Sequence, residues 1–287
     1  MPGDNKTIIG KNKYANAWPI FHYFDPKQLT YAAEMVTEVP AYLNQRMSEG
    51  SMDVGGAISS FAYGMLSDQL LLLPELSVTS NGPVKSVLLF SKLPIEELSR
   101  GTIALTNTSA TSVNLLHILL CMAYDGSPSY LTTEPDLDNM MEVADGALLI
   151  GDNAIKASWR DHGYNVYDLG EMWKSWTGHS MTFAVWAVNR QSAEQKPEAI
   201  EEIVKAFQQS KLRSQRNMKP VVQEAYRRIG GTEIYWEQYF NNLLYDFGST
   251  ELEGLRLYFR YAHELGLLPQ EVTTEIWHEN KLIRVKE

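Results

Sequence analysis

The chain has 287 residues, of which 44% are hydrophobic and 21% charged, so it is long enough for one or two packed domains and is not broadly disordered. Its 35 acidic and 25 basic residues give a formal charge of −10, which argues against a nucleic-acid partner, because such proteins need basic surface to displace counterions. A single cysteine, Cys121, excludes an intrachain disulfide and a cysteine-rich metal site.

The sequence pattern contains no targeting or membrane segment. No apolar run reaches the roughly 18–20 residues that a membrane span needs. Residues 1–15 hold one apolar pair, Ile8 and Ile9, which is far short of the apolar region of a signal peptide. We therefore expect a cytoplasmic protein with no membrane partner, acting as a monomer or a homodimer.

The first part of the chain alternates between short strands and helices. A helix with proline in its first turn is predicted over residues 40–47, and Gly50 ends it. Strands are predicted from their apolar residues over 7–10, 52–58, 70–73, 76–79 and 84–90.

The middle of the chain repeats this alternation and carries most of the negative charge. From Glu96 to Glu171 there are 3 basic residues against 12 acidic ones, whereas the remainder is close to neutral. A hydroxyl-rich turn at 106–112 leads into a buried helix over 113–120, and a second helix begins near Asn153. Strands are predicted over 102–105, 147–150, 165–169 and 182–189.

From Ser192 onward the pattern is helical. Apolar residues at helical spacing predict an amphipathic helix that begins near Pro197. Thr250 and Glu253 match a capping box before a helix over 255–265.

Strands that alternate with helices predict an α/β fold with largely parallel sheets. The two long apolar strands at 84–90 and 182–189 bracket the acidic segment, and we interpret them as paired strands that cross between two lobes, with the ligand cleft between the lobes. The predicted domains are a discontinuous first lobe, 1–88 with 188–287, and an acidic second lobe, 89–187.

Small polar residues follow the predicted strands, at the strand ends where α/β proteins bind ligands. The hydroxyls at 108–112 open a helix, and a helix N-terminus carries about half a positive charge and unpaired N–H groups, so this stretch suits a carboxylate or phosphate. One hydroxyl suffices for a cap, so simple capping by Ser109 or Thr111 is the alternative interpretation. The candidate substrate-binding residues are Ser59, Ser60, Thr108, Ser109, Thr111, Ser112, Gly151 and Asp152.

Three polar residues each allow two interpretations. Asp152, between a strand and a helix, is either an N-cap or a contact to a substrate hydroxyl. Asn16 is either an ordinary loop residue or a ligand contact. Ser86 lies in an apolar strand, where a buried serine usually bonds to backbone, but in a crossing strand it can also face the cleft.

Common catalytic and cofactor motifs are absent from the sequence. The six histidines lack metal-ligand spacing, and there is no P-loop, Gly-x-Gly-x-x-Gly or Gly-x-Ser-x-Gly. We expect no metal and no cofactor. The residues alone therefore predict a two-lobed protein with a cleft of neutral hydrogen-bond donors, suited to a small anion.

The order of the motifs resembles a known family. The blocks, in chain order, are Asn16-x-x-Pro19, Gly50-x-x-Asp53, Ile58-Ser59-Ser60, Gly82-x-Val84-x-Ser86, Thr106-x-x-Ser109-x-Thr111-Ser112, Leu149-Ile150-Gly151-Asp152, Asp168-Leu169-Gly170, Trp173-x-x-x-Thr177-Gly178 and Phe183-Ala184-Val185-Trp186. Over about residues 7–190 this series resembles the chorismate dehydratases of the futalosine route to menaquinone.

The resemblance implies a two-lobed fold like the type II periplasmic binding proteins. It also implies a lyase that converts chorismate, its small-molecule partner, into 3-[(1-carboxyvinyl)oxy]benzoate and water. By the resemblance, Asn16 and Ser86 match the catalytic positions. The residues that match the cleft blocks are Ser59, Ser60, Ser109, Thr111, Ser112 and Asp152.

This chemistry suits a cleft that is poor in bases. The dehydration yields an aromatic product, so orientation and well-placed donors can carry it, with the substrate's own side-chain carboxylate as the hypothetical base. Two other functions stay open. One is a solute-binding protein for a small anion, and the other is a sibling pathway enzyme that acts on a futalosine-type nucleoside through a histidine base.

Overall fold

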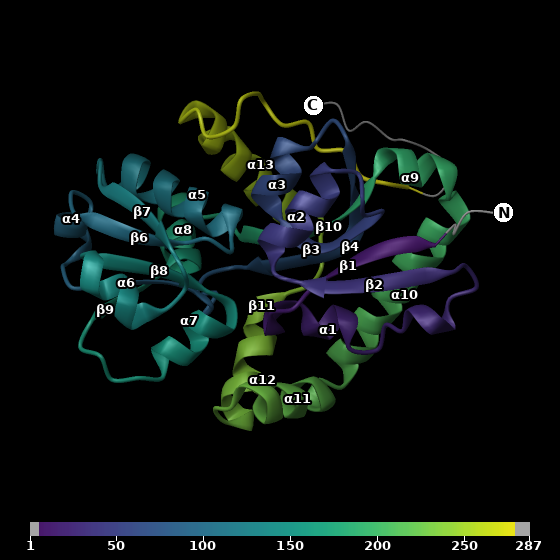
Figure 1. Ribbon diagram of the computed structural model, residues 1–287, viewed down its shortest axis with the longest axis horizontal. Helices are drawn as coiled ribbons and strands as arrows, with labels where there is room; N and C mark the ends of the chain where they lie inside the picture. The colour runs from purple at the N-terminus through teal and green to yellow at the C-terminus, as the bar shows by residue number, and fades with distance from the viewer. Residues whose placement is uncertain (1–5, 279–287) are drawn as a thin grey trace.

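Two β-sheets organise the chain, and each forms the centre of one lobe (Figure 1). The structure is a computed structural model that describes residues 6–278. Lobe 1 is built on a six-stranded sheet in the order β11-β4-β10-β3-β1-β2. Its strands are β1 (Thr7–Asn12), β2 (Ala33–Glu38), β3 (Val54–Ser59), β4 (Leu70–Ser80), β10 (Met181–Asn189) and β11 (Leu243–Leu244).

Lobe 2 is built on a five-stranded sheet in the order β7-β6-β8-β5-β9. Its strands are β5 (Val87–Ser91), β6 (Thr102–Thr106), β7 (Ser129–Thr133), β8 (Gly146–Ile150) and β9 (Asn165–Asp168). The short helix α4 (Ile95–Leu98), the helices α5 (Ala110–Ile118), α6 (Leu137–Val143), α7 (Gly151–Ser158) and α8 (Leu169–Thr177), and the π-helical turn η3 (Leu119–Ala123) complete the lobe.

The helices of lobe 1 lie on both faces of its sheet (Figure 1). The N-terminal ones are η1 (Ala15–Ala17), α1 (Trp18–Phe21), η2 (Pro26–Gln28), α2 (Pro40–Ser48) and α3 (Ser60–Met65). The C-terminal ones are α9 (Arg190–Gln195), α10 (Pro197–Arg216), α11 (Lys219–Ile229), α12 (Glu233–Asn242) and α13 (Ser249–Glu264). None of the helices within residues 6–278 combines the length and apolar character required to cross a bilayer.

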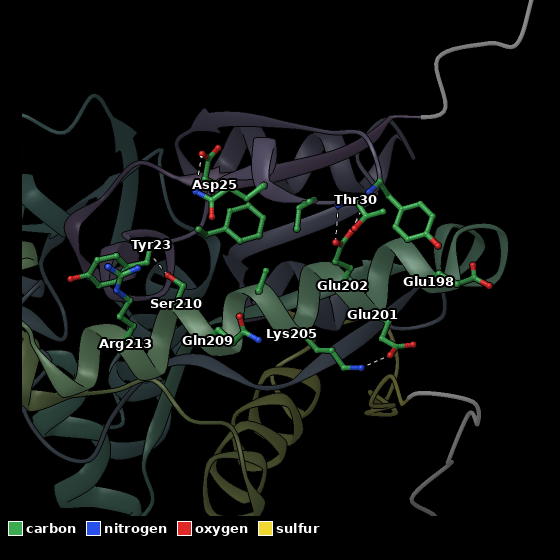
Figure 2. Close-up of a pocket in the computed structure, with 15 residues that line it drawn as sticks. Tyr23, Asp25, Thr30, Glu198, Glu201, Glu202, Lys205, Gln209, Ser210 and Arg213 are labelled. Atoms are coloured by element: carbon green, nitrogen blue, oxygen red, sulfur yellow. Dashed lines mark hydrogen bonds and ion pairs between the residues drawn. The ribbon is translucent and has the colours of Figure 1, made fainter.

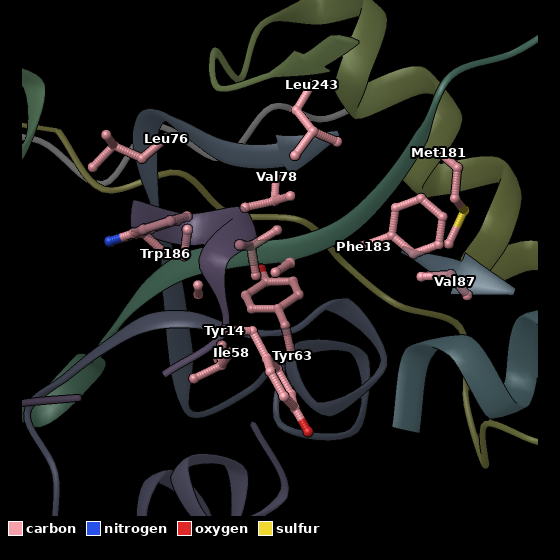
Figure 3. Close-up of a cluster of buried hydrophobic side chains, with 14 of the residues drawn as sticks. Tyr14, Ile58, Tyr63, Leu76, Val78, Val87, Met181, Phe183, Trp186 and Leu243 are labelled. Atoms are coloured by element: carbon pink, nitrogen blue, oxygen red, sulfur yellow. The ribbon is translucent and has the colours of Figure 1, made fainter. Parts of the chain in front are cut away.

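A continuous apolar core joins the two lobes. Figure 3 shows Trp186, Val78 and Tyr63 packed around the central strands of lobe 1. The same cluster includes Phe183 of β10 and Val87, which belongs to the first strand of lobe 2 (Figure 3). A second, smaller cluster lies entirely within lobe 2. Since burial of each such side chain contributes about 1.5–3 kcal/mol, the shared core favours a fixed arrangement of the lobes.

The chain passes from one lobe to the other between β4 and β5, and returns ahead of β10. Strands β4 and β10 pair antiparallel, with Ser80 opposite Met181. The segment that leaves lobe 1 and the segment that returns to it are therefore neighbours at the edge of this lobe. The predicted pairing of the strands at 84–90 and 182–189 is wrong, because β5 lies in the sheet of lobe 2 and β10 in that of lobe 1. Residues 181–187 therefore belong to the sheet of lobe 1, although these residues were predicted to lie in the second lobe.

Three local predictions also need correction. The sheets are mixed rather than largely parallel, since β10 and β5 each run antiparallel to both of their neighbours. The strands predicted at 70–73 and 76–79 form one strand, interrupted where Glu75 takes a left-handed φ of 61°. Helix α13 starts before the predicted capping box, and the Gly248 amide donates to the Glu251 carboxylate at 2.8 Å.

Gly254 is required where α13 packs against the chain just before β10. A Cβ atom at this position would lie 2.1 Å from the Ser180 carbonyl oxygen. Helix propensity favours alanine over glycine by about 1 kcal/mol, but relief of this overlap costs about 1–3 kcal/mol. We expect Gly254→Ala to lower the free energy of unfolding, measured by urea denaturation. The exposed neighbour Glu253→Ala serves as control, and a Gly254→Ala variant more stable than the wild type would contradict this packing argument.

Candidate functional site

One pocket lies on the outside of lobe 1. It has a volume of about 750 Å³ and is bounded by residues 23–31 and α10 (Figure 2). The Glu202 carboxylate accepts hydrogen bonds from the amides of Thr30 and Tyr31, at 2.7 and 3.2 Å. The Arg213 guanidinium lies 3.9 Å from the centre of the Tyr23 ring. These contacts fix the segment to the helix, and none of the candidate residues from the sequence lines this pocket.

Another pocket, of about 640 Å³, lies between the two lobes. Lys13, Tyr14 and Trp18 line it from lobe 1, whereas Thr108 and Asp152 line it from lobe 2. Two of the candidate substrate-binding residues therefore face this space. We refer to it as the interlobe pocket.

The segment after β1 reaches from lobe 1 toward lobe 2. The buried Asn12 side chain ends β1 by accepting a hydrogen bond from the Tyr14 amide at 3.0 Å, which turns the chain. The Tyr14 ring then covers Gly151, whose φ is 57° and where a Cβ atom would lie 2.8 Å from the ring. Burial raises the pKa of the Tyr14 hydroxyl, while the nearby Thr108 side chain acts in the opposite direction. Glycine at 151 is therefore what permits this close approach of the lobes.

Asp152 joins the lobes rather than capping its own helix. The N-cap of α7 is Ile150, and no side chain caps that helix. The Asp152 carboxylate instead accepts a hydrogen bond from the Ala15 amide of lobe 1 at 3.1 Å. Burial raises the pKa of Asp152, while that bond and the nearby cations, Lys156 foremost, act in the opposite direction.

Asn16 and Ser86 each adjoin a residue of this contact, although neither is among the residues that line the interlobe pocket. Ser86 is 1% exposed, and its carbonyl oxygen accepts from the Gly151 amide at 2.7 Å. Asn16 directly follows Ala15 in the chain. The Ala15 amide donates to the carboxylate of Asp152, the residue after Gly151 in α7. The Asn16 Oδ1 atom is buried without a hydrogen-bond partner among residues 6–278. An unsatisfied buried acceptor costs about 1–3 kcal/mol, so Asn16 is suited to a ligand that donates a hydrogen bond.

The serine and threonine side chains of α3 and α5 are already hydrogen-bonded within the protein. Ser59 is the N-cap of α3, and its oxygen accepts from the Ala62 amide at 3.2 Å. Ser60 donates to the Thr182 carbonyl at 2.7 Å. Ser109 caps α5 by accepting from the Ser112 amide at 3.3 Å, which confirms the capping interpretation for this residue.

Thr111 connects the starts of these two helices across the lobes. Its Oγ1 atom accepts a hydrogen bond from the Phe61 amide at 3.1 Å, and its carbonyl oxygen accepts from the Tyr258 hydroxyl at 3.2 Å. Thr108 differs from the other hydroxyls of this turn, because it lines the interlobe pocket. The candidate residues thus form two groups, one at the interlobe pocket and one at the contact between α3 and α5.

Basic residues that the sequence analysis did not single out also line the interlobe pocket. They are Lys13, Lys156 and Arg228, one each from the segment after β1, from α7 and from α11. Arg228 is held with its guanidinium 4.7 Å from the centre of the Trp18 ring and 2.9 Å from Glu224. Lys156 stands one turn after Asp152, a spacing that could have indicated a shared face. No sequence signal joins Arg228 to them.

Helix α12 also contacts lobe 2. The Tyr239 hydroxyl donates to the Ser86 Oγ atom at 2.9 Å. Trp159, which follows α7, packs edge-to-face on Trp236, with ring centres 6.2 Å apart. Tyr239 was not predicted from the sequence, because nothing local relates it to a serine 153 residues away. Within residues 6–278 no three His, Cys, Asp or Glu side chains are grouped as a metal site would require.

Replacement of Asp152 by asparagine is expected to change how stability depends on pH. Asparagine keeps a carbonyl acceptor for the Ala15 amide but does not ionise. Burial raises the pKa of Asp152 above 3.8, so the folded wild type loses stability as pH rises through the interval between 3.8 and that higher value. We therefore expect Asp152→Asn to match the wild type below that interval and to be more stable above it, in urea denaturation at about pH 3.5 and about pH 7. A constant difference at both pH values would contradict this assignment.

Comparison with known proteins relates the chain to one family and one fold. A family model described as menaquinone biosynthesis matches residues 7–264. Over 275 residues the chain is 32% identical to a chorismate dehydratase of Thermus thermophilus, covering 91% of this chain and 95% of that protein.

Two solved structures share the architecture. A protein from Archaeoglobus fulgidus has a TM-score of 0.74 at 20% identity, covering 93% of this chain and 100% of that one. The periplasmic aliphatic sulphonate binding protein SsuA from Escherichia coli has a TM-score of 0.69 at 14% identity, covering 99% and 96%. The predicted two-lobed α/β fold of the periplasmic-binding-protein kind is confirmed.

Proposed function

Since the chain belongs to the menaquinone biosynthesis family, we propose that it is a lyase that dehydrates chorismate to 3-[(1-carboxyvinyl)oxy]benzoate in the futalosine route. The observation that carries the proposal is its 32% identity to a chorismate dehydratase over 95% of that protein. The family resemblance of Asn16 and Ser86 agrees with it, as do their positions next to bonds made by Asp152, which lines the interlobe pocket, and by its neighbour Gly151.

The lining of the interlobe pocket holds more basic than acidic residues, since Lys13, Lys156 and Arg228 stand against Glu134 and Asp152. Chorismate carries two carboxylates, and Lys13, Lys156 and Arg228 line the pocket. Ion pairs between a substrate and such groups strengthen as water is excluded from the site. Positive charge thus adds to the neutral donors that we expected from the sequence, although the protein as a whole is acidic.

The unpartnered Asn16 oxygen fits one group of chorismate. The dianion has a single hydrogen-bond donor, its ring hydroxyl, which is also the group that leaves as water. In the proposed complex Asn16 Oδ1 accepts the hydrogen of this hydroxyl, which satisfies the buried acceptor. Ser86 donates to the same hydroxyl oxygen from its other side, and so stabilises the negative charge that develops there as the carbon–oxygen bond breaks.

The proton that is lost comes from the ring carbon that bears the enolpyruvyl ether. We propose that the side-chain carboxylate of the substrate accepts it, because the residues that line the interlobe pocket, within the part of the chain that the structure describes, include no histidine. The electrons of the broken carbon–hydrogen bond complete the aromatic ring as hydroxide departs. The hydroxide takes up the transferred proton and leaves as water.

Two alternative functions make different demands on the same pocket. A sibling enzyme for a futalosine-type nucleoside is expected to place a histidine base there, which the described lining lacks. A solute-binding protein for a small anion would bind its ligand unchanged. We further propose that the protein works in the cytoplasm, without nucleic acid or membrane partners, as a monomer or a homodimer.

The test of the proposed function is direct incubation with chorismate. Purified protein is mixed with chorismate, and the loss of diene absorbance is followed together with the appearance of an aromatic product of the expected mass. A heat-denatured sample controls for spontaneous breakdown. Chorismate that is bound but not consumed, or tight binding of another solute without turnover, would favour the solute-binding function instead.

A further inference from the structure

Tyr239 of α12 donates a hydrogen bond to the residue that we propose as a donor to substrate. Its hydroxyl lies 2.9 Å from Ser86 Oγ, and both side chains are buried, Tyr239 at 0% and Ser86 at 1% exposure. The two residues come from opposite parts of the chain, since Ser86 precedes β5 of lobe 2 and Tyr239 belongs to a C-terminal helix.

The hydroxyl hydrogen of Ser86 makes only a long hydrogen bond within the protein. Tyr239 has one hydroxyl hydrogen and gives it to Ser86 Oγ, so Ser86 must donate elsewhere. Its acceptor in the structure is the Val84 carbonyl at 3.4 Å, near the limit for such a bond. A substrate oxygen at normal distance is a better acceptor.

The position of the Tyr239 ring is fixed by its neighbours. Trp236 and Phe240 pack against it with ring centres 5.5 and 5.4 Å away. The Trp236 indole is itself held by a hydrogen bond to the Gly230 carbonyl at 2.7 Å. Burial raises the pKa of Tyr239 well above its ordinary value of 10.0, so the phenol stays protonated and keeps its role as donor.

We propose that Tyr239 is a positioning residue for the dehydration, which orients Ser86 as the hydrogen-bond donor to the departing hydroxyl of the substrate. This inference rests on the proposed function. In a chain from Tyr239 to Ser86 to substrate, each donated bond polarises the next, so Ser86 donates more strongly when Tyr239 donates to it. The C-terminal helices therefore contribute to the reaction as well as to the fold.

The alternative is that the bond between Tyr239 and Ser86 only ties α12 to lobe 2. The two roles predict different effects of removing the Tyr239 hydroxyl, in the wild type and in a variant that lacks the Ser86 hydroxyl. A purely structural bond would affect folding and leave turnover by the folded protein unchanged. A positioning bond would affect kcat, and only while Ser86 is present to transmit it.

The experiment compares Tyr239→Phe, Ser86→Ala and the double variant with the wild type in chorismate turnover. We expect Tyr239→Phe to lower kcat by about 5- to 30-fold with little change in KM, and to cause no further loss in the Ser86→Ala background. Tyr245→Phe is the matched control, because its hydroxyl is also fully buried but has no partner among residues 6–278, and we expect its kcat to be unchanged.

Each outcome bears on one proposal. A wild type that does not consume chorismate rejects the proposed function. If the wild type is active, then an unchanged kcat for Tyr239→Phe, or equal losses with and without Ser86, overturns the role of Tyr239. Should Tyr239→Phe melt well below Tyr245→Phe, 3-fluorotyrosine at position 239 keeps the hydroxyl and makes it a stronger donor, so an unaltered kcat there also overturns the role.

Discussion

Asn16→Ala is expected to remove nearly all turnover of chorismate, by about 10²–10³-fold in kcat, while binding of the substrate is retained. Asn16 Oδ1 is buried without a partner among residues 6–278, and in the proposed complex it holds the hydroxyl that leaves. Loss of this contact leaves the carboxylates of the substrate bound but frees its reacting end. Turnover is measured by product formation, and binding by calorimetry with the inactive variant.

The same substitution is expected to stabilise the ligand-free protein. Removal of an unsatisfied buried acceptor should raise the free energy of unfolding by about 1 kcal/mol. A variant that is inactive, binds substrate and is more stable than the wild type identifies a residue kept for function.

Two further variants make the Asn16 prediction sharper. Asn16→Asp keeps the shape of the side chain but places a negative charge where hydroxide leaves, so turnover should also be lost. Asn241→Ala, an exposed asparagine on α12, is the control and should behave as the wild type. Full activity in both Asn16 variants would rule out the proposed role.

Gly151→Ala should reduce kcat/KM by about 10²-fold through displacement of the segment that carries Asn16. The added Cβ atom would lie 2.8 Å from the Tyr14 ring, which is only 5% exposed and has little room to move. Tyr14 stands two residues before Asn16, so its movement shifts the proposed acceptor. The left-handed φ of 57° adds about 1–2 kcal/mol of backbone strain.

Gly163→Ala separates these two effects. Gly163 has a similar φ of 69°, but a Cβ atom there would meet nothing within 4 Å. We expect this variant to lose stability through backbone strain and to keep the wild-type kcat/KM. Equal activity in the two variants would show that the contact with Tyr14 does not matter for turnover.

The parts of the fold that depend on local pattern were predictable. Apolar runs placed β3, β6, β8 and β10 close to their observed bounds, and the cap at Ser109 follows from its hydroxyl before a helix. Strand direction was not predictable in the same way, because an apolar run is equally consistent with parallel and antiparallel neighbours. The half-exposed strand β2 carries too few apolar residues to give a signal.

The candidate site shows the same division. Asn16 and Ser86 were identified from the order of the motifs, but the contact between their two segments depends on a bond between residues 137 apart, Ala15 and Asp152. Asp152 was predicted as either a cap or a contact, and local residues could not decide between them because its partner lies in the other lobe. The basic lining was missed for the same reason, since Lys13, Lys156 and Arg228 converge from three distant segments.

The contact between Trp159 and Trp236 has a practical consequence. The two indoles lie 6.2 Å apart and nearly perpendicular, one after α7 and the other on α12. Chromophores this close couple their excited states, and the coupling falls steeply with separation. A comparison of wild-type and Trp159→Phe circular dichroism separates this signal from that of Trp173 and Trp176, whose ring centres lie 6.0 Å apart, and so reports on the contact between lobe 2 and the C-terminal helices without an attached label.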